Sequence, residues 1–540
     1  MSRIVFENER PPARIDPARA DIACFVGLAR CIQGAALPPA VRDWLQLHGW
    51  IGGPLARINP ADPFAPIVMP IADVPIPIET YSAFTALFDT GGSAESSGTD
   101  YLAAAVRTFF AQGGKCCYVV RMGDPLAADA KPQDKGLALQ MLLPGRSYAL
   151  DDRRSWHGAG HLAGLPDVSF LVMPDLPFLC ASAPQQATGP EPAPPSGPER
   201  FVECAPADVP AKAAVSYPTA APRLAPDDYT RWAAAVRTVL EFLSIGNQRE
   251  MLLVAAFPMP QSTDVAAAAE APGTSVTQSL HDVIAAVMPE PDPQAPHQTE
   301  GLGPGLSTTL LQLAYPWLKT IGSTVLLEGI EPPDGALAGL LARNALTRGT
   351  FTSATKVPLS QIFDVSPVLP AEETTVSAAP LAWGGAPPRP KPLIERLSLF
   401  GFTPSGLALL SDVTAYAGES YRPGRIYRLV TVIRREARRL GEDLIFQSNG
   451  PALWARVQAT LRQLMTRLWR LDALDGATVS DAFSVRCDRS TMTQNDLDSG
   501  RLVATISFNA ASTIELIRVT LALQTSEANP QSVSASMEAG

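Results

Sequence analysis

Two histidines four residues apart, His157 and His161, have the spacing of a zinc site in this 540-residue sequence. On a helix such a pair lies on one face, and a metalloprotease places its catalytic Glu between the two histidines. Here the intervening residues are Gly, Ala and Gly, which disfavour a helix and supply no carboxylate. We therefore expect a surface loop and no metal site.

Motifs for phosphate binding and nucleophilic catalysis are incomplete. Gly114 and Lys115 resemble the end of a phosphate-binding loop, but Cys116 follows where Ser or Thr is required. The glycines of residues 301–305 lie in a Pro-containing loop without the strand and helix of a dinucleotide site. No Gly-x-Ser-x-Gly elbow occurs, and the five histidines show no nucleophile spacing. We expect no enzyme and no catalytic, cofactor-binding or metal-binding residues.

The net charge of −10 disfavours a nucleic-acid binder that neutralises phosphates. Positive charge is nevertheless concentrated in residues 421–470, which hold 11 Arg and three acidic residues. One interpretation is a solvated helix face, and the other is an interface with an acidic partner. In the first of two helices expected here, the arginines that recur at helical spacing are Arg425, Arg428, Arg435 and Arg439.

Seven Cys without regular spacing, and an N-terminus without the apolar segment of a signal peptide, favour assembly in a reducing cytosol. No stretch approaches the roughly 18 apolar residues that a membrane helix requires. We therefore expect no membrane insertion.

Hydrophobic periodicity predicts an α/β fold. A helix at residues 101–112 stops at two glycines and leads into a buried strand at 116–122. Alternating strands and helices imply a mostly parallel sheet that is covered on both faces. Further along, we predict buried strands at 168–173 and 251–257, a helix at 228–243, a strand at 323–330 followed by a helix through 346, amphipathic helices at 425–440 and 451–470, and strands at 501–509 and 512–523.

The 52 Pro cluster in three segments that we expect to be linkers: residues 181–226, 271–305 and 371–392. We expect the small, polar tail at 524–540 to fray. Near the N-terminus, three Pro separate residues 3–6 from the first globular segment. This short run can add to the sheet edge of a neighbouring subunit or form an edge strand of its own domain.

Several segments resemble contractile phage-tail sheath proteins and the sheaths of related contractile injection systems. Residues 18–28 (ARADIACFVGL) and 101–122 (YLAAAVRTFFAQGGKCCYVVRM) are similar to the N-terminal signature of that family. Residues 329–359 resemble its mid-chain segment, a Pro-Pro-x-Gly turn and a helix, although Asn344 stands where an acidic residue is usual. Residues 451–502 are similar over a basic helix followed by Arg-Cys-Asp, Thr-Met-Thr-Gln-Asn-Asp and Gly-Arg-Leu.

This resemblance implies a structural subunit that polymerises helically around an inner tube and contracts to drive the tube through a target envelope. The implied partners are further copies of the chain, the inner tube protein, and baseplate and cap or terminator proteins, with no nucleic acid. The implied location is the bacterial cytoplasm during assembly, and then a phage tail or an injection particle. The alternatives are a sheath-like baseplate or cap adaptor, and an α/β enzyme.

The resemblance also implies an inner domain built from both chain ends, with an outer α/β domain inserted between them. Its parts would be an N-terminal arm at 1–19, the inner domain at 20–130 and 393–511, the outer domain at 131–392, and a C-terminal arm at 512–540. Arm strands that cross to neighbouring subunits would use Arg3, Ile4, Val5, Phe6, Ile514, Ile517, Val519, Leu521 and Leu523. Tube contacts would use Arg425, Arg428, Arg435, Arg439, Arg456, Arg462, Arg467 and Arg470.

Overall fold

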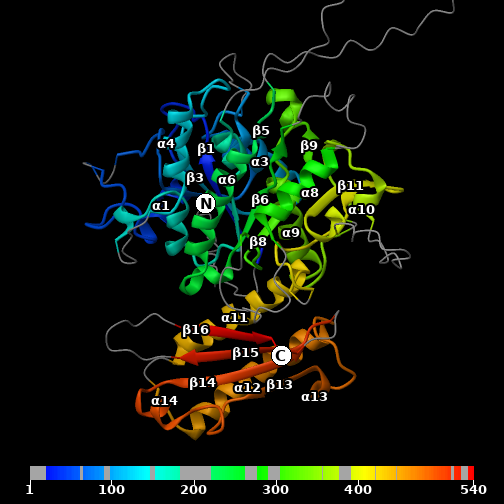
Figure 1. Cartoon of the computed structure of the whole chain (residues 1–540). Coiled ribbons are helices and arrows are strands. Elements are labelled where there is room, and N and C mark those ends of the chain that lie inside the picture. Colours follow the sequence, from blue (N-terminus) through cyan, green and yellow to red (C-terminus); the bar gives the residue numbers. More distant parts are fainter. Residues whose placement is uncertain are drawn as a thin grey trace, which may run out of the picture.

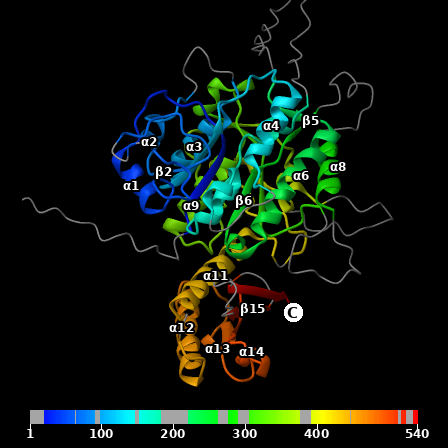
Figure 2. The ribbon, with the colours of Figure 1, turned by 90° about the vertical axis from the view of Figure 1, so that its left-hand side faces the viewer.

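The apolar run after Ala20 forms the strand β1 (Ala23–Leu28), in which every residue is buried. Parallel strands flank β1 on both sides, as expected for near-continuous apolar runs. The predicted α/β fold is confirmed: an eight-stranded, mostly parallel sheet has helices on both faces (Figures 1 and 2). Its order is β12 (Gly406–Leu409), β11 (Ser398–Thr403), β8 (Leu311–Tyr315), β6 (Leu252–Ala256), β4 (Phe170–Val172), β1, β3 (Cys117–Gly123) and β2 (Pro75–Ile78).

The computed structural model has a large part built on this sheet and a smaller C-terminal part, which Figure 1 shows below it. The described residues are 20–60, 62, 65–90, 98–145, 152–182, 220–261, 276–289, 305–355, 357–375, 391–419, 421–444, 447–511, 516–523 and 533–539, without the side chains of 276–278, 516–523 and 533–539.

Two helices cross on one face of the sheet because glycines let their backbones approach. These are α3 (Tyr101–Ala111) and α9 (Asp334–Thr347). A Cβ added at Gly335 would overlap the backbone of Ala105, and one at Gly339 would overlap that of Phe109. The glycine of the Pro-Pro-x-Gly segment therefore has a packing reason.

The other helices surround this core (Figure 2). On the face opposite α3 and α9, α5 packs against α4 and α6, and α6 packs against α8. Their bounds are α1 (Pro39–Leu47), α2 (Tyr81–Thr85), α4 (Pro132–Leu142), α5 (Leu176–Cys180), α6 (Pro226–Leu243), α8 (Val276–Val287) and α10 (Ala371–Thr374). Two small sheets pair β5 (Arg223–Leu224) with β7 (Met259–Pro260) and β9 (Trp317–Thr320) with β10 (Ile362–Ser366).

The C-terminal part, hereafter the C-terminal domain, places two long helices against a four-stranded antiparallel sheet (Figure 2). In the strand β14 (Leu502–Asn509), residues 505–509 alternate between half-buried and buried, because one face of the sheet packs against the helices. The elements are α11 (Gly424–Leu444), α12 (Pro451–Arg470), α13 (Val479–Ala482), β13 (Phe483–Arg486), α14 (Gln494–Asp498), β14 (Leu502–Asn509), β15 (Leu516–Leu523) and β16 (Val533–Ala539), with the strands in the order β13, β14, β15, β16.

The hydrophobic cores do not follow the predicted domain boundaries. One cluster of buried residues runs from Ile22 to Ala415 and includes Tyr427, and a second runs from Tyr421 to Ala510. Residues 20–130 therefore share a sheet and a core with 131–392 and also with 393–415, while residues 421–510 form a separate core, so the structure groups 20–130 with only the first part of 393–511. Buried apolar strands read alike in sequence, so their pattern does not say which distant strands pair.

Two predicted elements also differ from the structure. Residues 323–330 are not a strand but two 3₁₀ turns, because the Thr320 and Ser323 side chains bond nearby backbone and compete with a ladder. The tail at 524–540, which we expected to fray, contains β16. Backbone pairing with β15 needs no apolar side chains, so composition alone missed it.

Candidate interaction surface

The crevice where α/β sheets bind ligands is filled by protein in this fold. After β1 the chain adds β2 and β3 on one side of β1, and it then adds β4 on the other side. The carboxyl ends of β1 and β4 therefore form the topological switch point of the sheet. There the Leu28 backbone N–H donates to Asp175 Oδ2 at 2.7 Å, and a Cβ on Gly27 would overlap that carboxyl. Asp175 is completely buried, and burial raises the pKa of its carboxyl well above the usual value. Asp175 thus closes the crevice.

The two histidines fold back onto a distant carboxylate. His157 Nδ1 lies 2.9 Å from Asp73 Oδ2, and His161 Nε2 lies 2.7 Å from Asp73 Oδ1. Arg57 pairs with the same carboxylate. His161 is 0% exposed, and burial lowers the pKa of its imidazole to about 3, so the predicted surface loop is wrong at this residue.

The His157 side chain is 53% exposed. Among the described residues, no group of three or more His, Cys, Asp or Glu is arranged to hold a metal ion. The motif instead ties its loop to the chain before β2. Sequence reading missed Asp73 because it lies 84 residues from His157 and no local pattern links the two.

Two of the arginines predicted to contact the tube are buried. Arg428 is 4% exposed, and its guanidinium donates to both oxygens of Asp412 at 2.9 and 2.6 Å. Arg435 is 3% exposed and donates to Ser169 Oγ at 3.0 Å. The prediction of tube contact is wrong for these two, because α11 packs against the large sheet on the side where they lie.

The other two predicted arginines of α11 are more accessible. Arg425 is half-buried, and burial lowers the pKa of its guanidinium. Arg439 is exposed, although its chain neighbour Arg438 contacts Glu250 of the large part. Accessibility along α11 therefore depends on the side of the helix on which a residue lies.

The predicted arginines of α12 are all exposed, and we call Arg456, Arg462, Arg467 and Arg470 the α12 basic face. The opposite side of α12 is buried in the C-terminal domain through Val457, Leu461, Met465 and Leu468. Arg456, Arg467 and Arg470 lie on one side at the helical period, over about 21 Å of helix. None of the four forms an ion pair with the acidic residues that the structure describes.

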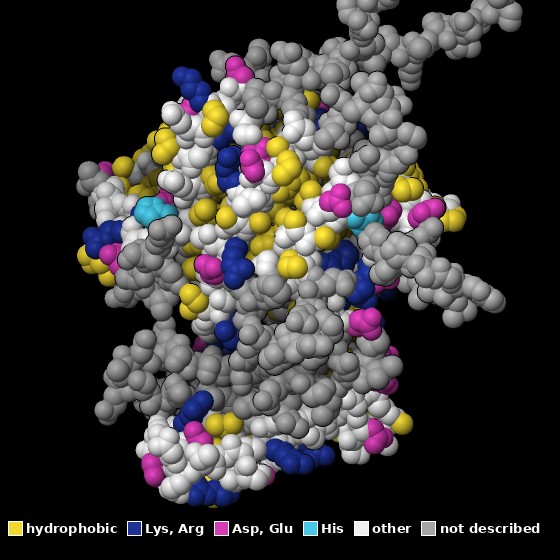
Figure 3. Space-filling model, in the orientation of Figure 1, with side chains coloured by type: hydrophobic (Ala, Val, Ile, Leu, Met, Phe, Trp, Pro, Cys, Tyr) yellow, Lys and Arg dark blue, Asp and Glu magenta, His cyan; other side chains and the backbone are white. Residues whose placement is uncertain are grey.

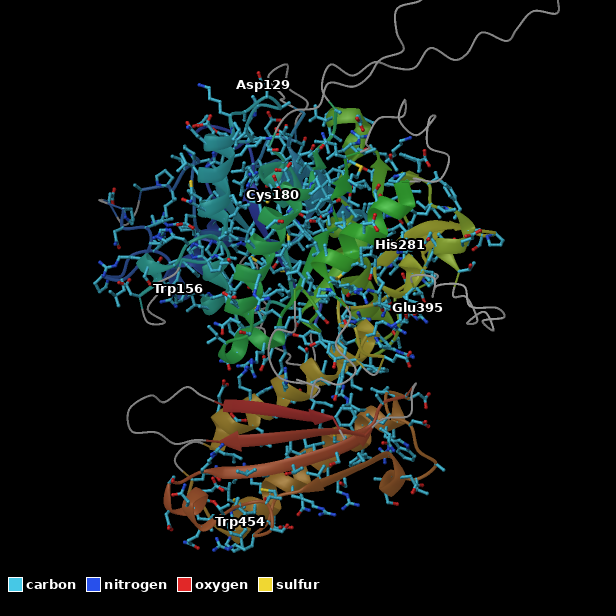
Figure 4. The ribbon with its side chains drawn as sticks, viewed as in Figure 1. Asp129, Trp156, Cys180, His281, Glu395 and Trp454 are labelled. Atoms are coloured by element: carbon cyan, nitrogen blue, oxygen red, sulfur yellow. The ribbon has the colours of Figure 1, made fainter. Side chains whose placement is uncertain are left out.

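The C-terminal domain also shows Arg side chains on the face visible in Figure 3. Figure 4 places Trp454, near the start of α12, at the end of the molecule away from the large sheet. Its indole Nε1 donates to Asn449 Oδ1 at 2.7 Å, which fixes the chain where α12 begins. The α12 basic face therefore lies on a helix that is exposed on its outer side.

The predicted arm strands are only partly described. Arg3, Ile4, Val5, Phe6 and Ile514 lie outside the described residues. The remaining four belong to β15, where Ile517, Val519, Leu521 and Leu523 pair in register with Phe508, Ile506, Ala504 and Leu502 of β14. In the single chain, β15 is thus a strand, as predicted, and it completes the sheet of its own C-terminal domain.

The first described residue, Ala20, is buried beside α11. It lines a small cavity together with Ser169, Glu250, Tyr427 and Thr431. Ala20 therefore lies at the junction between the large sheet and the C-terminal domain.

Comparison with known proteins points to one family. Residues 417–524 match the phage tail sheath C-terminal domain, and this range covers the C-terminal domain of the structure from α11 through β15. A search of curated proteins found no match. None of the described helices is long and apolar enough to cross a membrane.

Three solved structures illustrate the similarity. A chain of the anti-feeding prophage (AFP) baseplate, 6-fold symmetrised, is 16% identical with a TM-score of 0.51, over 95% of this chain and 96% of that chain. A chain of the AFP baseplate in the contracted state is 14% identical with a TM-score of 0.51, over 95% of each chain. A chain of the AFP helical sheath in the contracted state is 16% identical with a TM-score of 0.49, over 95% and 98%. The family match agrees with the resemblance drawn from the sequence over residues 417–524, and the two structures with a TM-score of 0.51 share the fold of the chain.

Proposed function

We propose that this chain, which carries a phage tail sheath C-terminal domain, is a structural sheath subunit of a contractile tail-like machine. The observation that carries the proposal is this domain with its exposed α12 basic face. Copies of the chain polymerise helically around an inner tube and contract to drive the tube through a target envelope. Head-to-tail contacts that do not close into a ring give such a helical polymer.

The α12 basic face fits a partner whose surface is acidic. Four exposed arginines on one helix attract such a surface at long range, and salt weakens that attraction. A contact that depends on exposed charge can also break when the tube has to advance. We therefore assign the α12 basic face, with Arg439 and the half-buried Arg425 at its margin, to the inner tube protein.

Terminal strands are proposed to connect neighbouring subunits. The C-terminal sheet has its edges at β13 and β16, where backbone groups can pair with a strand from another copy. If extended, the 14 residues that precede Ala20 span at most about 50 Å. This length would let residues 3–6 reach a neighbouring subunit. Exchange of residues 514–523 between copies would use the ladder that β15 forms here with β14.

Contraction would be a change between two packings of subunits that move as rigid bodies. The extended lattice would be metastable, and better contacts between subunits in the contracted lattice would supply the work. The remaining partners are baseplate and cap proteins. Assembly would take place in the bacterial cytoplasm, and the particle would then act as a phage tail or an injection system.

Negative-stain microscopy of the chain produced with the proteins of its genomic neighbours tests the proposal. We expect long striated sheaths around tubes, with many rings of copies per particle. Monomers that stay separate beside assembled tubes would contradict it. A single ring of copies per particle would instead identify a baseplate or cap adaptor.

A further inference from the structure

The helix α11 belongs to both cores of the molecule. Ile426, Leu429 and Ile433 are buried in the core of the C-terminal domain. On another side of the same helix, Tyr427 is buried in the core of the large sheet. Its hydroxyl lies 2.7 Å from the carbonyl oxygen of Arg249 and 3.0 Å from that of Met251. The helix α11 thus makes a packing contact between the two parts.

Near the start of α11, Arg428 is held by a carboxylate that is itself fixed. Besides the two bonds to Asp412, its guanidinium donates to the carbonyl oxygens of Thr350 and Thr352 at 3.1 and 3.2 Å. Asp412 also accepts from Gln312 Nε2 at 2.9 Å and from the backbone N–H of Ala354 at 3.0 Å. All of these partners belong to the large part of the molecule.

Two to three turns further along α11, two arginines, Arg435 and Arg438, approach Glu250 of the large part. Arg438 donates from Nε to Glu250 Oε1 at 3.0 Å and from Nη2 to Oε2 at 2.9 Å, which is the bidentate geometry. The Nε of Arg435 lies 3.7 Å from Glu250 Oε2, and Arg435 also donates to the carbonyl oxygen of Val168. Glu250 is 6% exposed and lies two residues before the start of β6.

We infer that Asp412 and Glu250 are positioning residues that lock α11 at two points and fix the C-terminal domain against the large sheet. This inference deepens the proposed function and rests on it: the sheath subunit moves as one rigid body, so motion of the large part reaches the α12 basic face. The segment that carries Glu250 also lies beside β16, at the sheet edge proposed for strand exchange.

The burial of Arg428 and Arg435 explains why α11 resists movement against the large part. A rotation or one-turn shift of α11 would separate Arg428 and Arg435 from their acceptors while both remain out of water. A buried guanidinium without partners is strongly disfavoured, so intermediate orientations are excluded. A junction of apolar side chains alone would tolerate sliding.

Hydrogen exchange on the full chain as a monomer tests the lock without any sheath. We expect Glu250→Gln and Arg438→Gln each to raise exchange of the α11 amides at residues 427–438 by about tenfold, with the β1 and β4 amides unchanged. The matched control is Arg237→Gln, which breaks the exposed ion pair between Arg237 and Glu241 on α6 and should leave α11 unchanged. Equal α11 exchange in the wild type and both Glu250 and Arg438 variants would overturn the inference.

A charge-swapped double variant distinguishes loss of the ion pair from general misfolding. The double variant Glu250→Arg with Arg438→Glu restores opposite charges at this site and should recover most of the protection that either single swap loses. Loss in the double variant equal to the sum of the two single losses would show that the pair does not act as a lock.

In assembled particles, the inference separates shortening of the sheath from movement of the tube. We expect Glu250→Gln sheaths to assemble and to shorten on triggering, while the tube advances less than half as often as in the wild type. Full tube advance by this variant would contradict the lock. Failure of the wild type to form a sheath would refute the proposed function alone, since the exchange measurement on the monomer does not depend on it.

Discussion

The large sheet and the C-terminal domain handle charge in opposite ways. In the large part, carboxyls such as Asp175, Glu331 and Asp334 are fully buried, and burial raises the pKa of each. In the C-terminal domain, four arginines of α12 point outward. The residues that looked most like chemistry, His157 and His161, are internal ties of the large part. This difference indicates that charged groups of the large part stabilise its interior, whereas the arginines of α12 are available for contacts with a partner.

Charge reversal on the α12 basic face should give the largest effect. With Arg456, Arg462, Arg467 and Arg470 all changed to Glu, we expect no extended sheath on tubes, because an acidic tube surface would then be repelled. The monomer should keep its circular dichroism spectrum and melting temperature, since these side chains are exposed. The matched control reverses the exposed Arg348 and Arg489, and microscopy should show normal sheaths. Normal sheaths with the α12 variant would contradict the assignment of the α12 basic face to the inner tube protein.

Overfilling the crossing of α3 and α9 should give a large effect on folding. Gly339→Ala places a methyl group against the backbone of Phe109, and we expect a loss of about 2–3 kcal/mol in the free energy of unfolding. The matched control is Gly136→Ala in α4, where no atom lies near the added Cβ. There, helix propensity predicts a gain of about 0.5–1 kcal/mol. Urea unfolding measures both, and a similar change in the two variants would contradict close packing at the crossing.

The buried carboxyls make the large part sensitive to alkali. Burial raises the pKa of Glu331 to about 8, from 4.5 for an ordinary Glu, although Thr108 and Thr320 donate to its carboxyl. For an acid with a raised folded-state pKa, the stabilisation is complete below the unfolded pKa and is lost as the pH rises through the folded one. We expect wild-type stability to fall by about 1–2 kcal/mol between about pH 6.5 and 9 because of this residue.

The variant Glu331→Gln isolates that contribution, because it cannot ionise. Its stability should depend less steeply on pH than that of the wild type over the same range. His161 does not interfere there, since its imidazole is neutral above its unfolded pKa of about 6.5 in both states. Parallel pH profiles of the melting temperature in the two proteins would show that Glu331 is ionised throughout.

The smallest effect on stability is expected for a substitution of the exposed Arg439 on α11. Arg439→Glu changes an exposed side chain on α11, and we expect the free energy of unfolding to change by less than about 0.5 kcal/mol. Four residues earlier on the same helix, Arg435→Ala should cost about 3 kcal/mol or more, because its buried acceptors lose their donor. Similar stabilities of the two variants would mean that Arg435 is not held as the structure shows.

Local sequence patterns predicted many elements well. The helices of residues 101–112 and 451–470 and the strand of 116–122 match α3, α12 and β3 to within a residue or two at each end. Their apolar periodicity and their glycine or proline boundaries are properties of the segment itself. The α12 basic face was predictable for the same reason, because one side of this helix is apolar and the other basic.

The α/β class, the amphipathic helices and the resemblance to sheath proteins could be predicted, because they depend on the order of residues along the chain. The place of residues 20–130 in the large sheet, the burial of Arg428 and Arg435, and the contact of Asp73 with both histidines became visible only in the folded chain. These outcomes depend on contacts between residues far apart in the chain. The free energy of such contacts depends on burial and partners, which the pattern of a single segment does not contain.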